Sequence, residues 1–349
     1  MSKTIEVCGR TVGFGQKVVI IAEVGVNHNG DLDLALEMIE SAASCGADIV
    51  KFQTIHPEGY VIPEAPKAGH QLRDQVGDSQ LEMLKRMDVG DDWYPTLFEC
   101  CDKNGVGFLS TPYEESGLEL LLEVGVDALK TDSANLTNLR FLSNAAATGL
   151  PLLVSTGMAT VDEIDDAVGV LRQGQSPFML LHCVSSYPAP VDQLNLRVIK
   201  TLEDYEVPVG YSDHCPDAEA ALGAVVLGAC LLEKHFTTDK GLPGPDQKAS
   251  ADPDEFRKMV GSIRRVEQAL GQDVPAPRAC ETESREKMRR SLCLSRDLKS
   301  GHILVADDLK AMRPGTGVSP ARLESLVGQA VVRDLPCYHV LSFEDVTTK

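Results

Sequence analysis

Two histidines each follow an apolar run of strand length, and a shared metal ion is one chemistry that this arrangement could support. The segment 207–214 reads VPVGYSDH, and the segment 229–236 reads ACLLEKHF. Imidazoles at the ends of neighbouring strands can converge on one borderline metal ion. A hydrogen-bonded pair in the core fits the same spacing, so the types and positions of His214 and His235 leave both interpretations open. His182, which ends another apolar run, is a third candidate ligand for which a place in the core is favoured.

Two lysines interrupt apolar runs, Lys51 in DIVKFQ and Lys130 in DALKTD. A buried ammonium is costly unless its charge is paired, so both lysines suggest a site for a phosphate or carboxylate. The alternative is an internal ion pair with a carboxylate such as Glu23. Three serines at neighbouring strand ends could donate hydrogen bonds to the same anion: Ser133, Ser155 and Ser212.

Overall composition narrows the classes of protein to which the chain can belong. The 349 residues include 33 Lys and Arg against 52 Asp and Glu, and the net charge of −19 disfavours nucleic acid and anionic membranes as partners. No apolar run approaches the ~20 residues of a membrane span, and the N-terminus lacks the pattern of a secretory signal. The ten cysteines are scattered without a CxxC pair. We therefore expect a cytoplasmic protein with mostly buried, reduced cysteines.

Short apolar runs alternate with longer amphipathic stretches from residue 18 to about 270. This rhythm is typical of βα units around a parallel sheet. Eight runs have the length and composition of strands: 18–24, 47–53, 106–111, 126–131, 151–156, 178–183, 207–212 and 229–236. The count of eight predicts an α/β fold of the (β/α)8 TIM-barrel type, whose active site lies at the carboxyl ends of the strands.

The connections between these runs predict helices and one long loop. Residues 31–46 carry a helical apolar stripe and end in Gly46, a stop signal. Residues 54–92 form an unusually long connection that we expect to cover the barrel mouth. A further helix is expected within 90–105, where Trp93 is expected to pack rather than to contact a substrate.

A change of composition after the eighth unit predicts a second, smaller domain. Residues 272–284 are rich in proline and charge and lose the apolar period, which indicates a linker between a barrel of residues 1–271 and a module of residues 285–349. That module shows short strands, turns and brief helices.

Seven motifs of the barrel region resemble the sialic acid synthase family in order and spacing: AEVGVNHNGD, VKFQT, FLSTP, STGM, GYSDH, LEKHFT and GPD. The segment AMRPGTGVSP resembles the signature of the SAF, or antifreeze-like, domain of the β-clip type that these synthases carry at the C-terminus. The match spans nearly the whole chain.

The resemblance implies a transferase similar to N-acetylneuraminate synthase. Such an enzyme condenses phosphoenolpyruvate with an N-acylated amino sugar, N-acetylmannosamine or a diacetamido relative, to give a sialic acid-type nonulosonic acid and phosphate. It also implies a divalent metal, Mn²⁺ or Mg²⁺, and a domain-swapped homodimer.

The resemblance further implies roles for individual side chains. The implied metal ligands are His214 and His235. The implied phosphoenolpyruvate-binding residues are Lys51, Lys130, Ser133, Ser155 and Ser212. The implied sugar contacts are Tyr187, Asp246 and, reaching into the neighbouring subunit, Arg313. The implied catalytic positions are Glu23, Gln53, Asn135 and Asp246.

The chain departs from the family pattern at two positions. Bacterial members read Lys-Ile-x-Ser-x-Glu where this chain reads KTDSAN, so Asn135 stands in place of a glutamate. An amide cannot carry a proton in acid–base catalysis. Either that carboxylate is dispensable, or Asp132 or Glu23 takes over its role, or the sugar differs. Gln247, in GPDQ, replaces a histidine common in the family.

Four alternatives remain open. The product could be legionaminic or pseudaminic acid. A synthase of the octulosonate or heptulosonate phosphate type would need a further Arg/Lys cluster for a phosphorylated sugar, which the strand ends lack. A catalytically idle barrel with a carbohydrate-binding or assembly module would have no reason to keep buried charge. A metal-dependent hydrolase would normally show a richer set of ligands.

Overall fold

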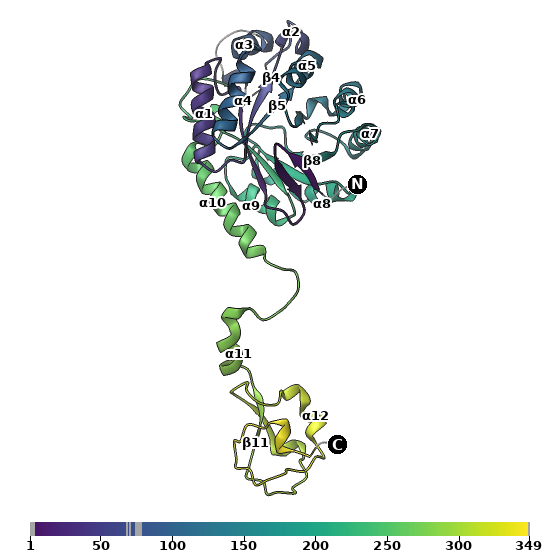
Figure 1. Cartoon of the computed structure of the whole chain (residues 1–349), viewed down its shortest axis with the longest axis vertical. Coiled ribbons are helices and arrows are strands. Elements are labelled where there is room, and N and C mark those ends of the chain that lie inside the picture. The colour runs from purple at the N-terminus through teal and green to yellow at the C-terminus, as the bar shows by residue number, and fades with distance from the viewer. Residues whose placement is uncertain (1–3, 68, 70, 74–78, 348–349) are drawn as a thin grey trace. The chain divides into compact units, whose positions relative to one another are not determined.

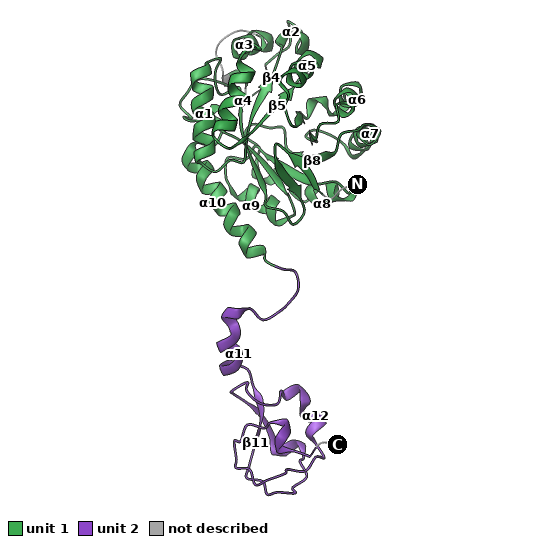
Figure 2. Cartoon of the chain, in the orientation of Figure 1, with its two compact units in different colours: residues 1–271 green, residues 272–349 purple. Residues whose placement is uncertain are grey.

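The chain forms two compact units, Met1–Gly271 and Gln272–Lys349 (Figure 2). In this computed structural model the described residues are 4–67, 69, 71–73 and 79–347. Unit 1 holds the barrel, and unit 2 holds the linker and the small C-terminal domain.

Eight parallel strands form the barrel of unit 1 (Figure 1). They pair in the order β5-β4-β3-β10-β9-β8-β7-β6, so that within the described residues the ladder is open only between β5 and β6. The strands are β3 (Val19–Gly25), β4 (Ile49–Thr54), β5 (Gly107–Pro112), β6 (Leu129–Thr131), β7 (Leu152–Ser155), β8 (Phe178–Cys183), β9 (Val209–Asp213) and β10 (Leu231–His235). The predicted fold is confirmed, and each predicted run coincides with one strand to within three residues at either end.

Helices surround the barrel (Figure 1). They are α1 (Leu32–Ser44), α2 (Pro57–Tyr60), α3 (Gln80–Met87), α4 (Trp93–Lys103), α5 (Glu115–Val124), α6 (Leu139–Ala147), α7 (Val161–Leu171), α8 (Val198–Leu202), α9 (Glu219–Val226) and α10 (Pro253–Leu270). The side chain of Asp31 caps α1, which ends just before Gly46. Among the described residues, no helix is long and apolar enough to span a membrane.

The long connection after β4 contains α2 and α3, and its residues 68, 70 and 74–78 lie outside the described residues. Trp93 begins α4 and packs edge-on against His28, with ring centroids 5.8 Å apart. Seven of the ten cysteines are buried, and all ten are free thiols.

The lower, amino-terminal half of the barrel interior is apolar. Side chains alternate between the interior and the helix-facing side along each strand. The interior cluster includes Val19, Ile21, Ile49, Leu109, Leu153, Met179, Leu181 and Leu231. The same cluster contains Ile5, Val7 and Val12 from an antiparallel hairpin of β1 (Thr4–Val7) and β2 (Arg10–Gly13), which the sequence analysis did not predict. The hairpin therefore packs on the lower end of the barrel.

A buried ion pair joins β9 to β10 on the outer side of the barrel wall. The Nζ atom of Lys234 lies 2.8 Å from Oδ2 of Asp213, and both side chains are almost fully buried. The same Nζ donates to the carbonyl of Cys215. The other carboxylate oxygen of Asp213 accepts from the backbone N–H of Cys215 at 3.0 Å. The pair thus fixes the segment after β9, which carries His214.

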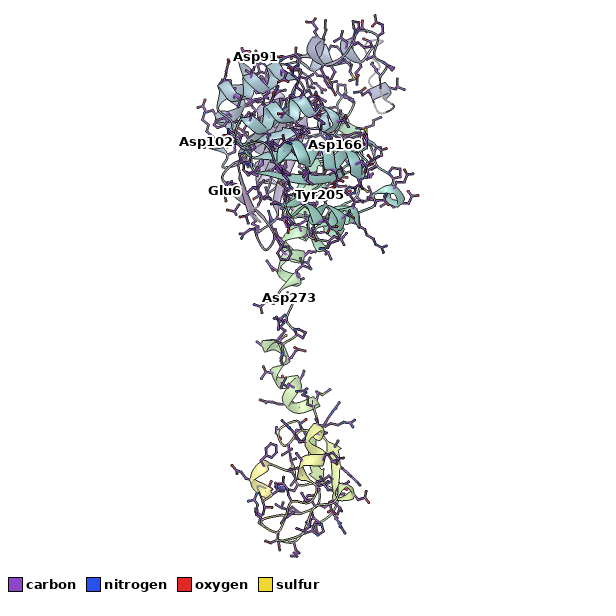
Figure 3. The ribbon with its side chains drawn as sticks, turned by 90° about the vertical axis from the view of Figure 1, so that its right-hand side faces the viewer. Glu6, Asp91, Asp102, Asp166, Tyr205 and Asp273 are labelled. Carbon is purple, nitrogen blue, oxygen red and sulfur yellow. The ribbon has the colours of Figure 1, made fainter. Side chains whose placement is uncertain are left out.

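Unit 2 is a small β-rich domain. Its elements are α11 (Thr282–Met288), β11 (Ser291–Leu294), β12 (Leu309–Met312) and α12 (Leu323–Leu326), with β11 and β12 antiparallel. Its core consists of leucines and valines. The linker that precedes α11 includes Asp273, which Figure 3 labels.

Unit 2 contains an internal repeat. Residues 296–309 read RDLKSGHILVADDL and residues 333–346 read RDLPCYHVLSFEDV. The equivalent residues Leu298 and Leu335 exchange two backbone hydrogen bonds of 2.9 Å, so the two halves meet at an approximate twofold axis.

Each half of the repeat is organised around one buried aspartate. Asp308 is hydrogen-bonded to Arg296 and to His302, both at 2.8 Å. In the other half, Asp345 accepts from Arg333 at 2.6 Å, lies 2.9 Å from Nε2 of His339 and accepts from the backbone N–H of Ser342. The repeat therefore builds the same charged cluster twice.

Replacing Asp345 by Asn is expected to destabilise unit 2 by about 1–3 kcal/mol. Burial raises the pKa of Asp345, but hydrogen bonds from Ser342, His339 and Arg333 outweigh burial and leave it below its ordinary value. A carboxylate with a lowered folded pKa stabilises the fold above its unfolded pKa of about 3.9. This contribution is therefore lost as the pH falls from about 5 towards the lowered folded pKa.

Hydrogen exchange of unit 2 peptides in the full chain, compared at pH 7 and pH 4, measures the Asp345 effect. The control is Asp334→Asn, because Asp334 pairs with Lys299 at an exposed position, where ion pairs contribute little. Equal protection of the Asp345 variant and the native chain at pH 7 would contradict the assignment.

Replacing Lys234 by Met is expected to destabilise unit 1 by about 3–5 kcal/mol, because the carboxylate of Asp213 is left buried without its cation. Adding Asp213→Asn to the same chain should recover part of this loss. Urea denaturation measures both variants. Lys200→Met, which breaks an exposed pair with Glu203, serves as control and should cost at most about 1 kcal/mol.

Candidate active site

Polar side chains form two tiers in the upper half of the barrel interior. The deep tier consists of Lys51, Lys130, Ser212 and Glu233. The upper tier consists of residues two positions further along the same chain segments: Gln53, Asp132, His214 and His235. Two strand residues advance about 7 Å towards the carboxyl end, so the upper tier lies nearer the mouth.

In the deep tier, Lys51 lies between two buried carboxylates. Its Nζ atom is 2.8 Å from Oε2 of Glu23 and 3.9 Å from Oε1 of Glu233. It also donates to the hydroxyl of Thr111 at 3.0 Å. The internal ion pair that the sequence left open for Lys51 is therefore present.

Lys130 differs from Lys51 in its partners. Its Nζ atom donates to Oγ of Ser155 at 2.6 Å and to the carbonyl of Thr131 at 3.0 Å. Among the described residues, no carboxylate oxygen lies within ion-pair distance of this ammonium, although its side chain is buried. Lys130 thus presents a buried positive charge that an anionic ligand could neutralise.

The remaining serines of the predicted anion site have protein partners. Ser212 donates to Oε1 of Glu233 at 2.9 Å. The hydroxyl of Ser133 accepts from the backbone N–H of Gly157 at 3.0 Å. The structure therefore brings Lys130 and Ser155 together directly, and links Lys51 with Ser212 through Glu233.

Glu23 and Glu233 differ in their acidity. Burial raises the pKa of Glu23 to about 7; Lys51 opposes the rise and the charge of Glu233 adds to it. Burial acts on Glu233 too, but Lys51 and Lys130 outweigh burial and lower its pKa to about 2. Glu23 can therefore take up or release a proton near neutral pH, which suits an acid–base role.

His214 and His235 lie side by side in the upper tier, with ring centroids 5.6 Å apart. Nδ1 of His214 lies 2.7 Å from the carbonyl of Val184. Nδ1 of His235 is buried, has no hydrogen-bond partner and lies 3.8 Å from the carboxylate of Asp246. Burial lowers the pKa of both imidazoles, and for His235 the neighbouring His214 adds to this effect. Both are therefore neutral at pH 7, the form that binds metals.

The histidine pair fits a divalent metal with an open coordination shell. The bond from Nδ1 of His214 to a carbonyl orients the ring and leaves Nε2 as a ligand atom, as is usual for metal-bound histidines. The unpartnered nitrogen of His235 is a second indication. Among the described residues, no group of three His, Cys, Asp or Glu side chains could hold a metal, so further ligands would be water or substrate. His182 instead bonds to the carbonyl of Leu194.

The predicted sugar and catalytic residues surround the histidines unevenly. The ring of Tyr187 lies 4.2 Å from that of His214 and 5.6 Å from that of His235. Gln53 donates to Oε1 of Glu23 at 2.9 Å. Arg313 belongs to unit 2, where it is exposed and donates to the carbonyl of Met288.

The two departures from the family pattern have structural roles. Asn135 donates to Oδ1 of Asp132 at 2.7 Å and to the carbonyl of Tyr113 at 3.1 Å, which uses both hydrogens of its amide. Gln247 is buried and bonds to the hydroxyl of Thr237 and to the carbonyl of Asn27. Both side chains therefore hold neighbouring loops in place.

Sequence reasoning missed several polar residues of this site. Glu233 is two residues before His235, so the period of two along a strand was the signal that could have found it. The same period places Thr111 and Tyr113 on the inner side of β5 and of its continuation. Tyr60, whose ring centroid lies 4.8 Å from that of Tyr113, comes from the long connection and left no such signal.

Comparison with known proteins agrees with this geometry. The NeuB family matches residues 38–275, and the SAF domain matches residues 289–348. The N,N'-diacetyllegionaminic acid synthase of Legionella pneumophila is 40% identical over 341 residues, covering 96% of each chain. The human N-acetylneuraminate-9-phosphate synthase is 34% identical, covering 95% of this chain and 94% of the relative.

A solved structure supports the same assignment. The N-acetylneuraminic acid synthetase of Leptospira borgpetersenii, crystallised with citrate, is 38% identical and superposes with a TM-score of 0.73, covering 81% of this chain and 95% of that one. The resemblance to sialic acid synthases drawn from the sequence motifs is confirmed. The chain belongs to the NeuB family and carries a SAF domain at its C-terminal end.

Proposed function

We propose that this protein condenses phosphoenolpyruvate with the open-chain aldehyde of an N-acylated amino sugar, releasing a nonulosonic acid and phosphate. The relatives described above are synthases of N,N'-diacetyllegionaminic acid and of N-acetylneuraminate 9-phosphate. The observation that carries the proposal is a deep tier with an unpaired lysine beneath two neutral imidazoles. A trianionic substrate and an aldehyde would bind one above the other in such a site.

Phosphoenolpyruvate is assigned to the deep tier. Lys130 offers a buried charge without a carboxylate partner, and Ser155, 2.6 Å away, offers a hydroxyl. Lys51 can share its charge between Glu23 and the ligand. Ser133 and Ser212 complete the proposed set of donors to the carboxylate and phosphate oxygens.

Mn²⁺ or Mg²⁺ is assigned to His214 and His235. When bound, the metal ion would polarise the aldehyde oxygen as a Lewis acid. Tyr187 and Asp246, beside these imidazoles, would orient the sugar.

The proposed reaction forms one carbon–carbon bond and one carbon–oxygen bond, and breaks the carbon–oxygen bond to phosphate. Carbon three of phosphoenolpyruvate attacks the aldehyde carbon with the electron pair of its double bond, and the aldehyde oxygen takes up a proton. Carbon two, now oxocarbenium-like, takes up water, which loses one proton; the resulting hydroxyl loses its proton as the bond from carbon two to the phosphate oxygen breaks, which gives the ketone and protonated phosphate. Glu23, with its pKa of about 7 and its bond to Gln53, is placed to carry a proton between these steps.

We further propose a domain-swapped homodimer in which Arg313 reaches the sugar site of the partner subunit, and a cytoplasmic location. The ten free cysteines are consistent with a reducing compartment. The proposed product is one of N-acetylneuraminic, legionaminic and pseudaminic acid.

The purified protein is expected to release phosphate only when phosphoenolpyruvate, an N-acylated amino sugar and Mn²⁺ are all present. A coupled phosphate assay with N-acetylmannosamine and with diacetamido sugars measures this. Replacing Lys130 by Met should raise the KM for phosphoenolpyruvate more than tenfold, because the variant loses a charge-assisted contact. Absence of phosphate release with every sugar would refute the proposed function.

Replacing His214 by Ala is expected to weaken Mn²⁺ binding at least tenfold, since one of two protein ligands is lost. Titration calorimetry with Mn²⁺ alone measures this without turnover. The control is His302→Ala in unit 2, where the histidine bonds to Asp308. Unchanged Mn²⁺ affinity in the His214 variant would exclude His214 as a ligand.

A further inference from the structure

The carboxylate of Asp132 is oriented but not neutralised. Its Oδ1 accepts from the amide of Asn135 at 2.7 Å, and its Oδ2 accepts from the backbone N–H of Ala134 at 3.0 Å. Among the residues that the structure describes, no Lys, Arg or His nitrogen lies within ion-pair distance of either oxygen. The neighbouring carboxylate Glu23, by contrast, has Lys51. Asp132 is therefore an anionic acceptor ready for a ligand that donates hydrogen bonds.

Asp132 belongs to the upper tier, two residues beyond Lys130. The charge of Asp132 acts on Lys51. Burial lowers the pKa of Lys51, but the charges of Glu23, Glu233 and Asp132 together outweigh burial and raise it. Asp132 directly follows β6, which ends at Thr131, and so lies at the carboxyl end of the barrel. A ligand of the upper tier would meet this carboxylate.

Asn135, which donates to Asp132, also lines a pocket of about 400 Å³ formed by segments that follow β4, β5 and β6. Its lining includes the rings of Tyr60, Tyr113 and Phe141 and the side chains of Asn135, Glu114 and Glu115. Among the described residues that line it, two are glutamates and none is lysine or arginine. The aromatic surfaces suit methyl and methylene groups, whereas the glutamates disfavour an anion.

Tyr113 and Asn135 connect this pocket to Asp132. The ring of Tyr113 packs against Tyr60, with centroids 4.8 Å apart. The carbonyl of Tyr113 accepts from the amide of Asn135 at 3.1 Å, and the same amide donates to Asp132. Tyr113 and Asn135 both line the pocket, so Asn135 links the pocket to the carboxylate of Asp132.

We propose that Asp132 and the pocket formed by Tyr60 and Tyr113 bind the end of the amino sugar remote from its aldehyde. This subsite takes an uncharged tail bearing hydroxyl or acylamino groups, and it rejects a phosphorylated tail. Asn135 is a positioning residue that orients Asp132. The proposal rests on the proposed function, because it assigns a substrate class to the same site.

Kinetics of Asp132→Asn test the carboxylate. The KM for N-acetylmannosamine should rise roughly ten- to hundredfold, the range for losing a hydrogen bond to a charged group, while the KM for phosphoenolpyruvate stays within about twofold. Tyr60→Ala should likewise raise the KM for N-acetylmannosamine and leave the KM for phosphoenolpyruvate within about twofold. Asp166→Asn, on α7 (labelled in Figure 3), is the matched control and should change neither.

Charge selectivity is tested with N-acetylmannosamine 6-phosphate. The native protein should use it with a kcat/KM about 100-fold or more below that for the unphosphorylated sugar. In Asp132→Asn this ratio should fall by about tenfold, because one repelling charge is gone. A purely structural role for Asp132 would lower both values equally and leave the ratio unchanged, which would overturn the proposal.

Binding separates this inference from the proposed function. If no sugar supports phosphate release, the condensation is wrong, but titration calorimetry with N-acetylmannosamine and its 6-phosphate still tests the subsite. Weaker binding of the uncharged sugar to Asp132→Asn than to the native protein supports the subsite. Equal affinities for both proteins, no detectable binding of the uncharged sugar, or tighter binding of the 6-phosphate overturns it.

Discussion

The barrel interior depends on one buried cation, Lys51, that lies between two carboxylates. Glu23 and Glu233 face the same interior, and two buried anions without a cation would be too costly to fold around. The ammonium of Lys51 lies 2.8 Å from the carboxylate of Glu23 and 3.9 Å from that of Glu233, and its charge offsets the cost of burying them. Among the described residues, Lys130 is the lysine of the deep tier that has no carboxylate within ion-pair distance.

Much of this fold could be predicted from the sequence, because strands buried on both faces are continuously apolar and stand out from their neighbours. The hairpin of β1 and β2 could not, because its turn uses Cys8 at φ 47° and Gly9 at φ 71° rather than the usual Asn-Gly or Asp-Gly. The repeat in unit 2 has six identical residues across 14 positions, which is too weak a pattern to predict by itself how the two halves pack. The structural role of the repeat becomes visible only in the fold, where Leu298 and Leu335 are hydrogen-bonded to each other.

The residues of the candidate site could be predicted from the sequence, but the contacts between them could not. Spacing put polar residues at strand ends, yet it could not decide whether Lys51 pairs with Glu23 or with a ligand, since that depends on which side chains reach each other across the barrel. The motif KTDSAN drew attention to Asn135 as a lost carboxylate. In the structure the amide's two hydrogens are already engaged, and the charge resides three residues earlier, on Asp132. A sequence motif gives the types of residue, whereas the structure is needed to locate the charged groups.

The hairpin packed on the lower end of the barrel leaves the mouth as the way in to the deep tier. A molecule that binds in the deep tier therefore enters past the level of His214 and His235, which lie nearer the mouth. Under the proposed chemistry, phosphoenolpyruvate has to arrive before the sugar, and phosphate formed below has to wait until the nine-carbon acid above it departs. The order of substrate binding and product release therefore follows from a single opening, at the end of the barrel opposite β1 and β2.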